Sequence, residues 1–151
     1  MMDTFILFTL AGTTYAVRTR DVLHIEMVEE ITPVPDATGS VDGVVFSRGL
    51  VVPVVNLRAR FGFERVAPDL RSRLLVVQSD GRTVGLLVDS AREFARIAPE
   101  TIKPPQEALT RLSGRYLEGI ALVQDRIVLV LDLSVVIEIA EPLELGAKEA
   151  V

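Results

Sequence analysis

The chain has 151 residues, of which 49% are hydrophobic and 25% are charged, and its formal net charge is −5. This much apolar sequence suffices for a buried core and excludes a disordered chain. Acidic and basic residues are interspersed, so the basic stripe that nucleic-acid binding requires is not visible. Because there are no cysteines, disulfides and thiolate metal sites are excluded. The longest apolar runs are of strand length and no secretory signal is visible, so we expect a cytoplasmic protein.

Four β-hairpins are predicted along the chain. Each pairs two runs rich in Val, Ile, Leu and aromatic residues, joined by turn residues that accept a positive φ or bond their own backbone. Asp80-Gly81 is the strongest of these turn signals. In chain order, the paired runs are Phe5–Leu10 with Thr14–Arg18, Val44–Phe46 with Leu50–Val55, Arg73–Gln78 with Thr83–Asp89, and Ile120–Val123 with Arg126–Leu131.

Short helices are expected after the second and fourth hairpins. Asn56 and Asp132 end these hairpins, and both residue types are good N-caps. The helices would cover Arg58–Phe61 and Ser134–Ile139. A further helix over Gln106–Leu112 is expected in the connection that precedes the fourth hairpin.

The hairpins recur at fixed spacing, which indicates two copies of one unit. Gly43 and Gly119 are 76 positions apart, and Gly12 and Gly81 are 69 positions apart. Each copy would contain a hairpin, a crossing segment, a second hairpin and a capped helix. Short strands with tight turns predict small barrels or a sandwich, with the boundary near residues 65–72. A groove between two half-units is a natural binding place.

Side chains suited to catalysis or metal binding are few. His24 is the only histidine; we interpret it as a partly exposed strand residue, with a general base or a pH-sensitive contact as the alternative. Metal binding would need carboxylates, since no second histidine exists for a zinc site. Asp89 and Glu93 could form an acid–base pair, although turn and surface roles are commoner for carboxylates. Phosphate-binding and nucleophile motifs are absent. We therefore expect no catalytic residue, no cofactor and no metal.

Two features of the second hairpin suggest protein binding. Arg48 lies at the predicted tip, where it is either a solvated turn residue or a contact residue of the kind that recurs at interface hot spots. Pro53 lies inside a strand and cannot donate a ladder hydrogen bond, so we expect that strand to be an edge or to be bulged there. An edge strand invites pairing with another protein.

The segment Val41–Arg58, VDGVVFSRGLVVPVVNLR, resembles the signature of CheW-like domains. That signature reads as Gly, two apolar residues, Asn-Leu-Arg-Gly, two or three apolar residues, and Pro-Val-apolar-Asp-Leu-Arg. The similarity covers about Thr4 to Ile139. Supporting stretches agree in order: Phe5–Leu10 with Tyr15, Val84–Asp89, Ile102–Pro104, and Tyr116-Leu117 before Gly119.

The resemblance implies an all-β fold of two SH3-like five-stranded β-barrels with short helices. A CheW-like domain would span residues 1–141 as two intertwined barrels, and residues 142–151 would form a flexible tail. Such proteins are scaffolds without enzymatic activity or cofactor. They join a chemoreceptor's cytoplasmic tip to the regulatory domain of a CheA-type histidine kinase. The chain would be cytoplasmic, recruited to receptor arrays at the inner membrane, with no membrane insertion and no nucleic-acid binding.

The resemblance also assigns residues. Arg48 stands where the family has the arginine of its Asn-Leu-Arg-Gly turn, a residue implicated in coupling. The chain departs from the signature where Phe46-Ser47 replaces Asn-Leu and where Asn56 replaces Asp, and His24 stands where many members have a Glu implicated in partner contact. The expected partner-binding residues are Arg48, Val22, His24, Leu74, Val84, Phe94, Val45, Phe46 and Pro53.

Alternatives to a coupling protein stay open at this point. The departures would fit a divergent paralogue that serves a separate chemosensory or pilus-motility pathway. A small-molecule or nucleic-acid-binding β-barrel is a second class, although the acidic balance and the scarcity of aromatic residues argue against nucleic acid. An enzyme built on Asp89 and Glu93 would need a deep pocket in which the two carboxylates converge.

Overall fold

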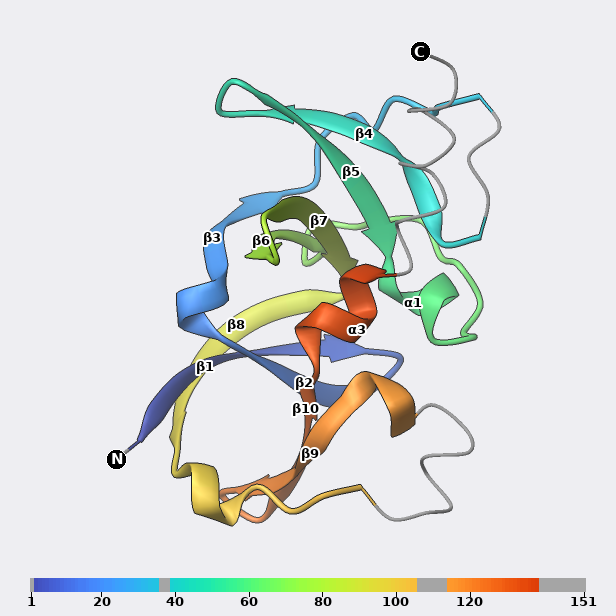
Figure 1. The fold of residues 1–151 in the computed structure, drawn as a ribbon. Coiled ribbons are helices and arrows are strands. Elements are labelled where there is room, and N and C mark those ends of the chain that lie inside the picture. The colour runs from blue at the N-terminus through green and yellow to red at the C-terminus, as the bar shows by residue number, and fades with distance from the viewer. Residues whose placement is uncertain (1, 36–38, 106–113, 139–151) are drawn as a thin grey trace.

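The computed structural model describes residues 2–35, 39–105 and 114–138. Two five-stranded β-sheets lie one above the other, each curled into a barrel, with short helices between them (Figure 1). The expected all-β architecture of two five-stranded barrels is confirmed. Within the described ranges, no helix has the length and apolar character needed to cross a membrane.

The lower sheet in Figure 1 is called barrel A and the upper sheet barrel B. Barrel A contains β1 (Asp3–Leu10), β2 (Thr13–Arg18), β8 (Ser90–Ile97), β9 (Leu117–Val123) and β10 (Arg126–Leu131). Barrel B contains β3 (Val22–Met27), β4 (Val41–Ser47), β5 (Leu50–Asn56), β6 (Arg73–Ser79) and β7 (Arg82–Val88). Neighbouring strands follow the order β8–β1–β2–β10–β9 in barrel A and β3–β6–β7–β5–β4 in barrel B.

The twofold sequence repeat recurs in the element order. β1 to β5 and α1 (Leu57–Arg60) are repeated as β6 to β10 and α3 (Leu133–Glu138). The parallel strand pair of each barrel has the same register. Val54 lies opposite Gly85 between β5 and β7, and Val130 lies opposite Ala16 between β10 and β2. Val54 and Val130 are 76 positions apart, and Ala16 and Gly85 are 69 apart. The spacings of the sequence repeat therefore relate the two barrels residue by residue.

Each barrel takes strands from both copies of the repeat. Barrel A joins the hairpin β1–β2 of the first copy to β8, β9 and β10 of the second, and barrel B does the reverse. A boundary at residues 65–72 separates the two copies but not the two barrels. The reason is that β5, before this segment, and β6, after it, both pair with β7 in barrel B.

All four predicted hairpins form, and the turn of each contains two successive residues with positive φ. Two left-handed residues in a row give the tight turn whose twist matches that of the flanking strands. The first three turns place glycine second, where a missing Cβ removes the steric cost. The turn pairs are Ala11-Gly12, Arg48-Gly49, Asp80-Gly81 and Gln124-Asp125.

Apolar side chains fill the interior of each barrel and the space between the barrels. Along β1, Phe5 and Leu7 belong to the cluster inside barrel A, whereas Ile6, Phe8 and Leu10 belong to a larger cluster shared with barrel B. The shared cluster also takes residues from β6, β7 and α3. This alternation follows from the period of two in a strand. Because the largest core needs both barrels, the two form one structural unit.

Both predicted helices form and begin one residue earlier than expected, at Leu57 and Leu133, and α1 also ends one residue earlier. The Asn56 side-chain oxygen accepts a hydrogen bond from the Ala59 N–H at 3.2 Å and caps α1. Asp132 instead accepts the Ser134 hydroxyl at 2.9 Å. Single 3-10 turns cover Thr19–Asp21 (η1), Pro99–Thr101 (η2) and Gly114–Tyr116 (η3). The helix expected over Gln106–Leu112, the last residue of the helix expected at Ser134–Ile139 and the tail 142–151 lie outside the described residues.

The strand that contains Pro53 is not an edge, so that prediction is wrong. β5 lies between β7 and β4, and β4 is the outer strand. Pro53 is tolerated because the pairing of β5 with β7 begins one residue later, at Val54. The predicted bulge is also not at Pro53, since the register of β4 and β5 shifts between Val41 and Gly43.

Two equivalent glycines bring a crossing segment onto each second hairpin. Thr32 pairs with Val44 beside Gly43, and Lys103 pairs with Ile120 beside Gly119. A Cβ on Gly43 would overlap the carbonyl of Thr32, and one on Gly119 would overlap the carbonyl of Lys103. Glycine is needed at both positions so that the two backbones can approach.

Candidate protein-interaction surfaces

The hairpin β4–β5 carries an exposed apolar pair. Phe46 is 77% exposed and Val51 is 67% exposed, and the two lie opposite one another across the strands. Leu50 and, on β3, Met27 are also exposed. The hairpin projects from barrel B at the upper left of Figure 1. We call Phe46, Val51 and Leu50 the B patch. Large exposed apolar side chains that lie together indicate a contact surface.

Arg48 lies at the tip of this hairpin in a left-handed conformation, with φ of 49°. Its side chain is 70% exposed, and its Nε lies 4.0 Å from Glu26 Oε2. Beside it, a compact polar cluster joins β3 to β4. His24 Nε2 lies 2.7 Å from Glu26 Oε2 and 2.9 Å from Ser47 Oγ, and the Ser47 hydroxyl donates to Glu26 at 2.5 Å.

Barrel A repeats the apolar pair at the equivalent hairpin, β9–β10. Leu122 and Ile127 are 68% and 60% exposed and lie opposite one another. They are 76 positions after Phe46 and Val51. We call Leu122 and Ile127 the A patch. The same local pattern has therefore placed an outward apolar pair on both barrels.

A cavity of about 510 Å³ opens beside the A patch. Its apolar lining includes Met2, Leu7, Phe94, Ile97, Leu122 and Val123. At its rim, Arg126 donates two hydrogen bonds of 3.0 Å to Glu93. These hydrogen bonds lower the pKa of the Glu93 carboxyl below its ordinary value.

The expected partner-binding residues fall into three groups by exposure: exposed, partly buried and, as described in the next paragraph, fully buried. Arg48, Phe46 and Phe94 are exposed, as a contact residue requires. Val22, His24, Val45 and Pro53 are partly buried. The pairings place His24 on β3, place Val45, Phe46 and Pro53 on the hairpin β4–β5 with Arg48 at its tip, and place Phe94 on β8 of barrel A. Of these, Val45 packs against the cluster inside barrel B.

Leu74 and Val84 require a correction. They are 2% and 0% exposed, so neither offers a surface to a partner. Leu74 points into barrel B, and Val84 points into the core between the barrels. The central strands that carry them are covered on both faces, which removes the exposed face that an outer strand would have.

Strand patterning alone does not identify the residues that complete the two patches. It predicts strands, but no surface, at Val51, Leu50, Leu122 and Ile127. A signal was available, because two apolar residues opposite one another near a hairpin turn recur at the repeat spacing of 76 positions.

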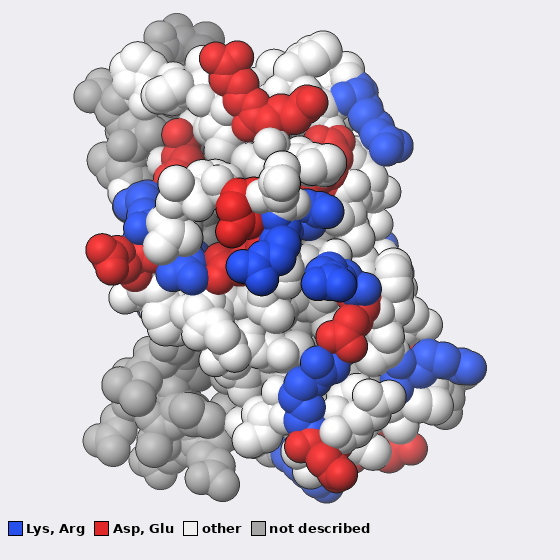
Figure 2. All heavy atoms as spheres, turned by 180° about the vertical axis from the view of Figure 1, so that it is seen from behind, with Lys and Arg blue, Asp and Glu red and all other residues white. Residues whose placement is uncertain are grey.

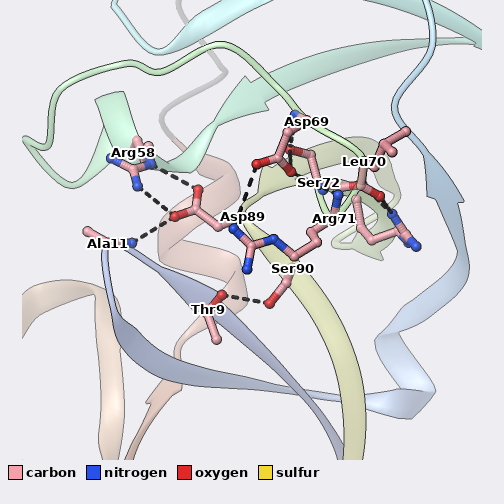
Figure 3. A network of polar contacts seen from close by, with 10 residues as sticks. Thr9, Ala11, Arg58, Asp69, Leu70, Arg71, Ser72, Asp89 and Ser90 are labelled. Carbon is pink, nitrogen blue, oxygen red and sulfur yellow. Dashed lines mark hydrogen bonds and ion pairs between the residues drawn. The ribbon is translucent and has the colours of Figure 1, made fainter.

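A polar cluster around Asp89 ties the two barrels together (Figure 3). Asp89 accepts two hydrogen bonds from Arg58, at 2.9 and 2.7 Å, and a third from the Ala11 N–H at 2.9 Å. Burial alone would raise the pKa of Asp89, but these hydrogen bonds outweigh it and hold the pKa below its ordinary value. The cleft around this cluster has a volume of about 340 Å³.

Asp89 and Glu93 have structural roles in this geometry, and they do not form an acid–base pair. Each carboxylate is engaged by an arginine, and each has a lowered pKa, whereas a general acid near neutral pH needs a raised one. No three His, Asp or Glu side chains in the described part of the chain gather as a metal site would require. On the face in Figure 2, charges of both signs are interspersed.

Comparisons with known proteins agree with this geometry. The family model described as the CheW-like domain matches residues 4–141. The chain is 34% identical to the chemotaxis protein CheW of Thermotoga maritima over 137 residues, which cover 87% of this chain and 83% of that protein. It is 27% identical to the chemotaxis protein CheW of Klebsiella aerogenes over 130 residues, which cover 86% and 78%. The crystal structure of the scaffolding protein TtCheW from Thermoanaerobacter tengcongensis matches with a TM-score of 0.81 at 29% identity, covering 88% of this chain and 86% of that one. With a family model matched over nearly its whole length, the chain belongs to the CheW-like domain family.

Proposed function

We propose that this protein is a chemotaxis scaffold that couples a chemoreceptor to a CheA-type histidine kinase. The similar proteins named above are a scaffolding protein and chemotaxis proteins. The match to them extends over both barrels, which supports a role for the whole two-barrel unit.

The observation that carries the proposal is the repeated apolar pair. Phe46 and Val51 on barrel B, and Leu122 and Ile127 on barrel A, face solvent at equivalent places of the repeat. Large side chains at two separate exposed sites suit a protein that holds two other surfaces at once. Hot spots of interfaces are typically such well-placed large side chains.

The partners that we infer are the regulatory domain of the kinase and the cytoplasmic tip of the receptor. Arg48 stands beside the B patch and can offer a planar, bidentate contact to a partner carboxylate. The protein would act in the cytoplasm, at receptor arrays on the inner membrane, without enzymatic activity of its own. Weak contacts repeated across an array would give the assembly its strength through multivalency.

Capture of the protein from its native cell, with identification of what comes with it, tests this function. We expect a CheA-type kinase and a chemoreceptor to be recovered with the unmodified chain. Arg48→Glu should fold normally, since its side chain is exposed, but should recover less kinase or receptor. The matched control is Arg71→Glu, an exposed arginine in the segment between α1 and β6. Recovery of neither partner with the unmodified chain would refute the proposal.

A further inference from the structure

Three arginines follow β5 closely in the sequence, and two of them have a carboxylate partner. Arg58 donates to Asp89 at 2.9 and 2.7 Å. Arg65 donates to Asp42 at 3.0 Å. Arg60, the last residue of α1, differs from both, because its Nε and Nη2 atoms are buried and have no hydrogen-bond partner. Leaving a buried donor of a charged group unpaired is costly, so the surroundings of Arg60 call for an acceptor.

A second arginine lies against the same aromatic ring as Arg60. The guanidinium carbons of Arg60 and Arg115 each lie 4.9 Å from the centroid of the Tyr116 ring. Arg115 also donates to the Tyr116 hydroxyl at 2.7 Å. Among the residues that the structure describes, no carboxylate forms an ion pair with either arginine. Two positive charges are therefore gathered at one ring without a negative charge in contact with them.

The electrostatics of this pair favour a bound anion. Burial and, more weakly, the charge of Arg115 lower the pKa of Arg60, since both disfavour its charged form. A carboxylate would offset both effects, because it can accept two parallel hydrogen bonds from one guanidinium. The Nη1 atom of Arg60 is not among the buried atoms, and Arg115 is exposed. A carboxylate can therefore approach the pair from solvent.

A source of such a carboxylate follows α3 in the sequence. We call residues 139–151 the acidic tail, because they contain Glu141, Glu144 and Glu149 but only one basic residue, Lys148. α3 begins beside the arginine pair, since the N–H of Asp132 donates to the carbonyl of Tyr116 at 2.8 Å. A helix of six residues is about 9 Å long, and three further residues span at most about 10 Å. Glu141, the first glutamate of the tail, is therefore within reach of the pair.

We propose that Arg60 and Arg115 form a carboxylate-binding site, and that the acidic tail occupies it through Glu141. The tail then joins α1, which belongs to the first copy of the repeat, to η3 and α3, which belong to the second. Every group in this contact belongs to the chain itself, so the inference does not rest on the proposed function. A carboxylate from another molecule is the competing occupant, and the experiments below distinguish it from the tail.

Nuclear magnetic resonance of the full chain tests the site, with the Nε–H signals of Arg60 and Arg115 as the readout. Glu141→Gln removes the proposed carboxylate and should shift both signals. Glu149→Gln is the matched control, because it removes the same charge from the far end of the tail, and it should leave both signals in place. Signals that do not change in Glu141→Gln, or that change equally in the control, would overturn the assignment of Glu141.

A nitroxide label locates the tail, because the chain has no cysteine and Leu145→Cys provides a single attachment point. The label should broaden the Arg60 and Arg115 signals at low salt. It should broaden them much less at about 1 M salt, where the Debye length is about 3 Å, and in the double variant that also carries Glu141→Gln.

Broadening that is equal with and without Glu141→Gln would show that the tail lies there without its carboxylate being bound, which would overturn the proposal. Added acetate distinguishes the competing occupant. If acetate shifts both arginine signals of the unmodified chain while Glu141→Gln leaves them unchanged, the site takes a carboxylate from another molecule, and occupancy by the tail is refuted.

Discussion

At the scale of single residues, Asp89 shows how one carboxylate can join two barrels, because it accepts hydrogen bonds from Arg58, which follows β5 of barrel B, and from Ala11 of barrel A. Asp89 follows β7, Arg58 lies on α1 after β5, and Ala11 lies in the β1–β2 turn. The sequence predicted the turn and the helix, because both depend on neighbouring residues. It did not predict that Arg58 meets Asp89, since that contact depends on how the two copies are folded together.

Asp89→Asn should destabilise the fold by about 1–3 kcal/mol at neutral pH, because it leaves the Arg58 guanidinium without its charged acceptor. The pKa of Asp89 is lowered in the folded chain. Its carboxylate therefore stabilises the fold above its ordinary pKa of 3.8, and this contribution is lost as the pH falls through the lower folded value. Urea unfolding at about pH 7 and pH 3 measures the effect. A penalty of equal size at both pH values would contradict this assignment.

Gly43→Ala should cost about 2–3 kcal/mol, as expected when backbone strain and overlap act together. Its φ is 146°, and the new Cβ would overlap the Thr32 carbonyl. Gly62→Ala is the matched control, because its φ is also positive but the space around it is open. Thermal unfolding of both variants gives the comparison. Equal losses would mean that the close approach to Thr32 contributes nothing.

At the scale of elements, hairpins were predictable and surfaces were not. Turn residues such as Asp80-Gly81 act locally, so all four hairpins could be located from the sequence. The exposure of their side chains depends on which faces of a strand are covered. Leu74 was expected at a surface, but β6 has apolar clusters on both faces. Phe46 was expected at a surface and is one, because its hairpin projects beyond the core.

The two patches should act independently of each other. Phe46→Asp and Leu122→Asp each place a charge on an exposed position, so unfolding free energies should change by less than about 0.5 kcal/mol. Each should weaken the binding of one partner by at least about tenfold, which corresponds to about 1.4 kcal/mol. Isothermal titration with the kinase regulatory domain and with a receptor fragment would separate them. If both variants bind both partners as tightly as the unmodified chain does, the two patches take no part in the interaction.

At the scale of the whole molecule, the sequence spacing predicted two copies of one unit but not the exchange of strands between them. Equivalent residues such as Val54 and Val130 occupy the same register in both barrels. A fold in which each copy closes its own barrel would have satisfied the same spacing. The difference lies in long-range pairing, and no local pattern of residues records it.

Neither half of the chain should fold alone, because each barrel requires strands from both copies. Fragments 1–66 and 67–151 should lack a cooperative unfolding transition when separate and should regain sheet structure when mixed. Circular dichroism would follow this. The intact chain should unfold in a single transition, with the signals of Tyr15 and Tyr116 in the shared core changing together with the backbone signal. A cooperative unfolding transition in either isolated half would contradict the exchange of strands between the two copies.

The measurement that bears most directly on the central claim is assembly of a three-part complex on receptor-bearing vesicles. Kinase should sediment with the vesicles only when this chain is added, because the chain must hold both partners at once. The double variant Phe46→Asp with Leu122→Asp, folded to the same thermal midpoint, should leave the kinase in the supernatant. Kinase that sediments equally well without the chain, or with the double variant, would contradict the account.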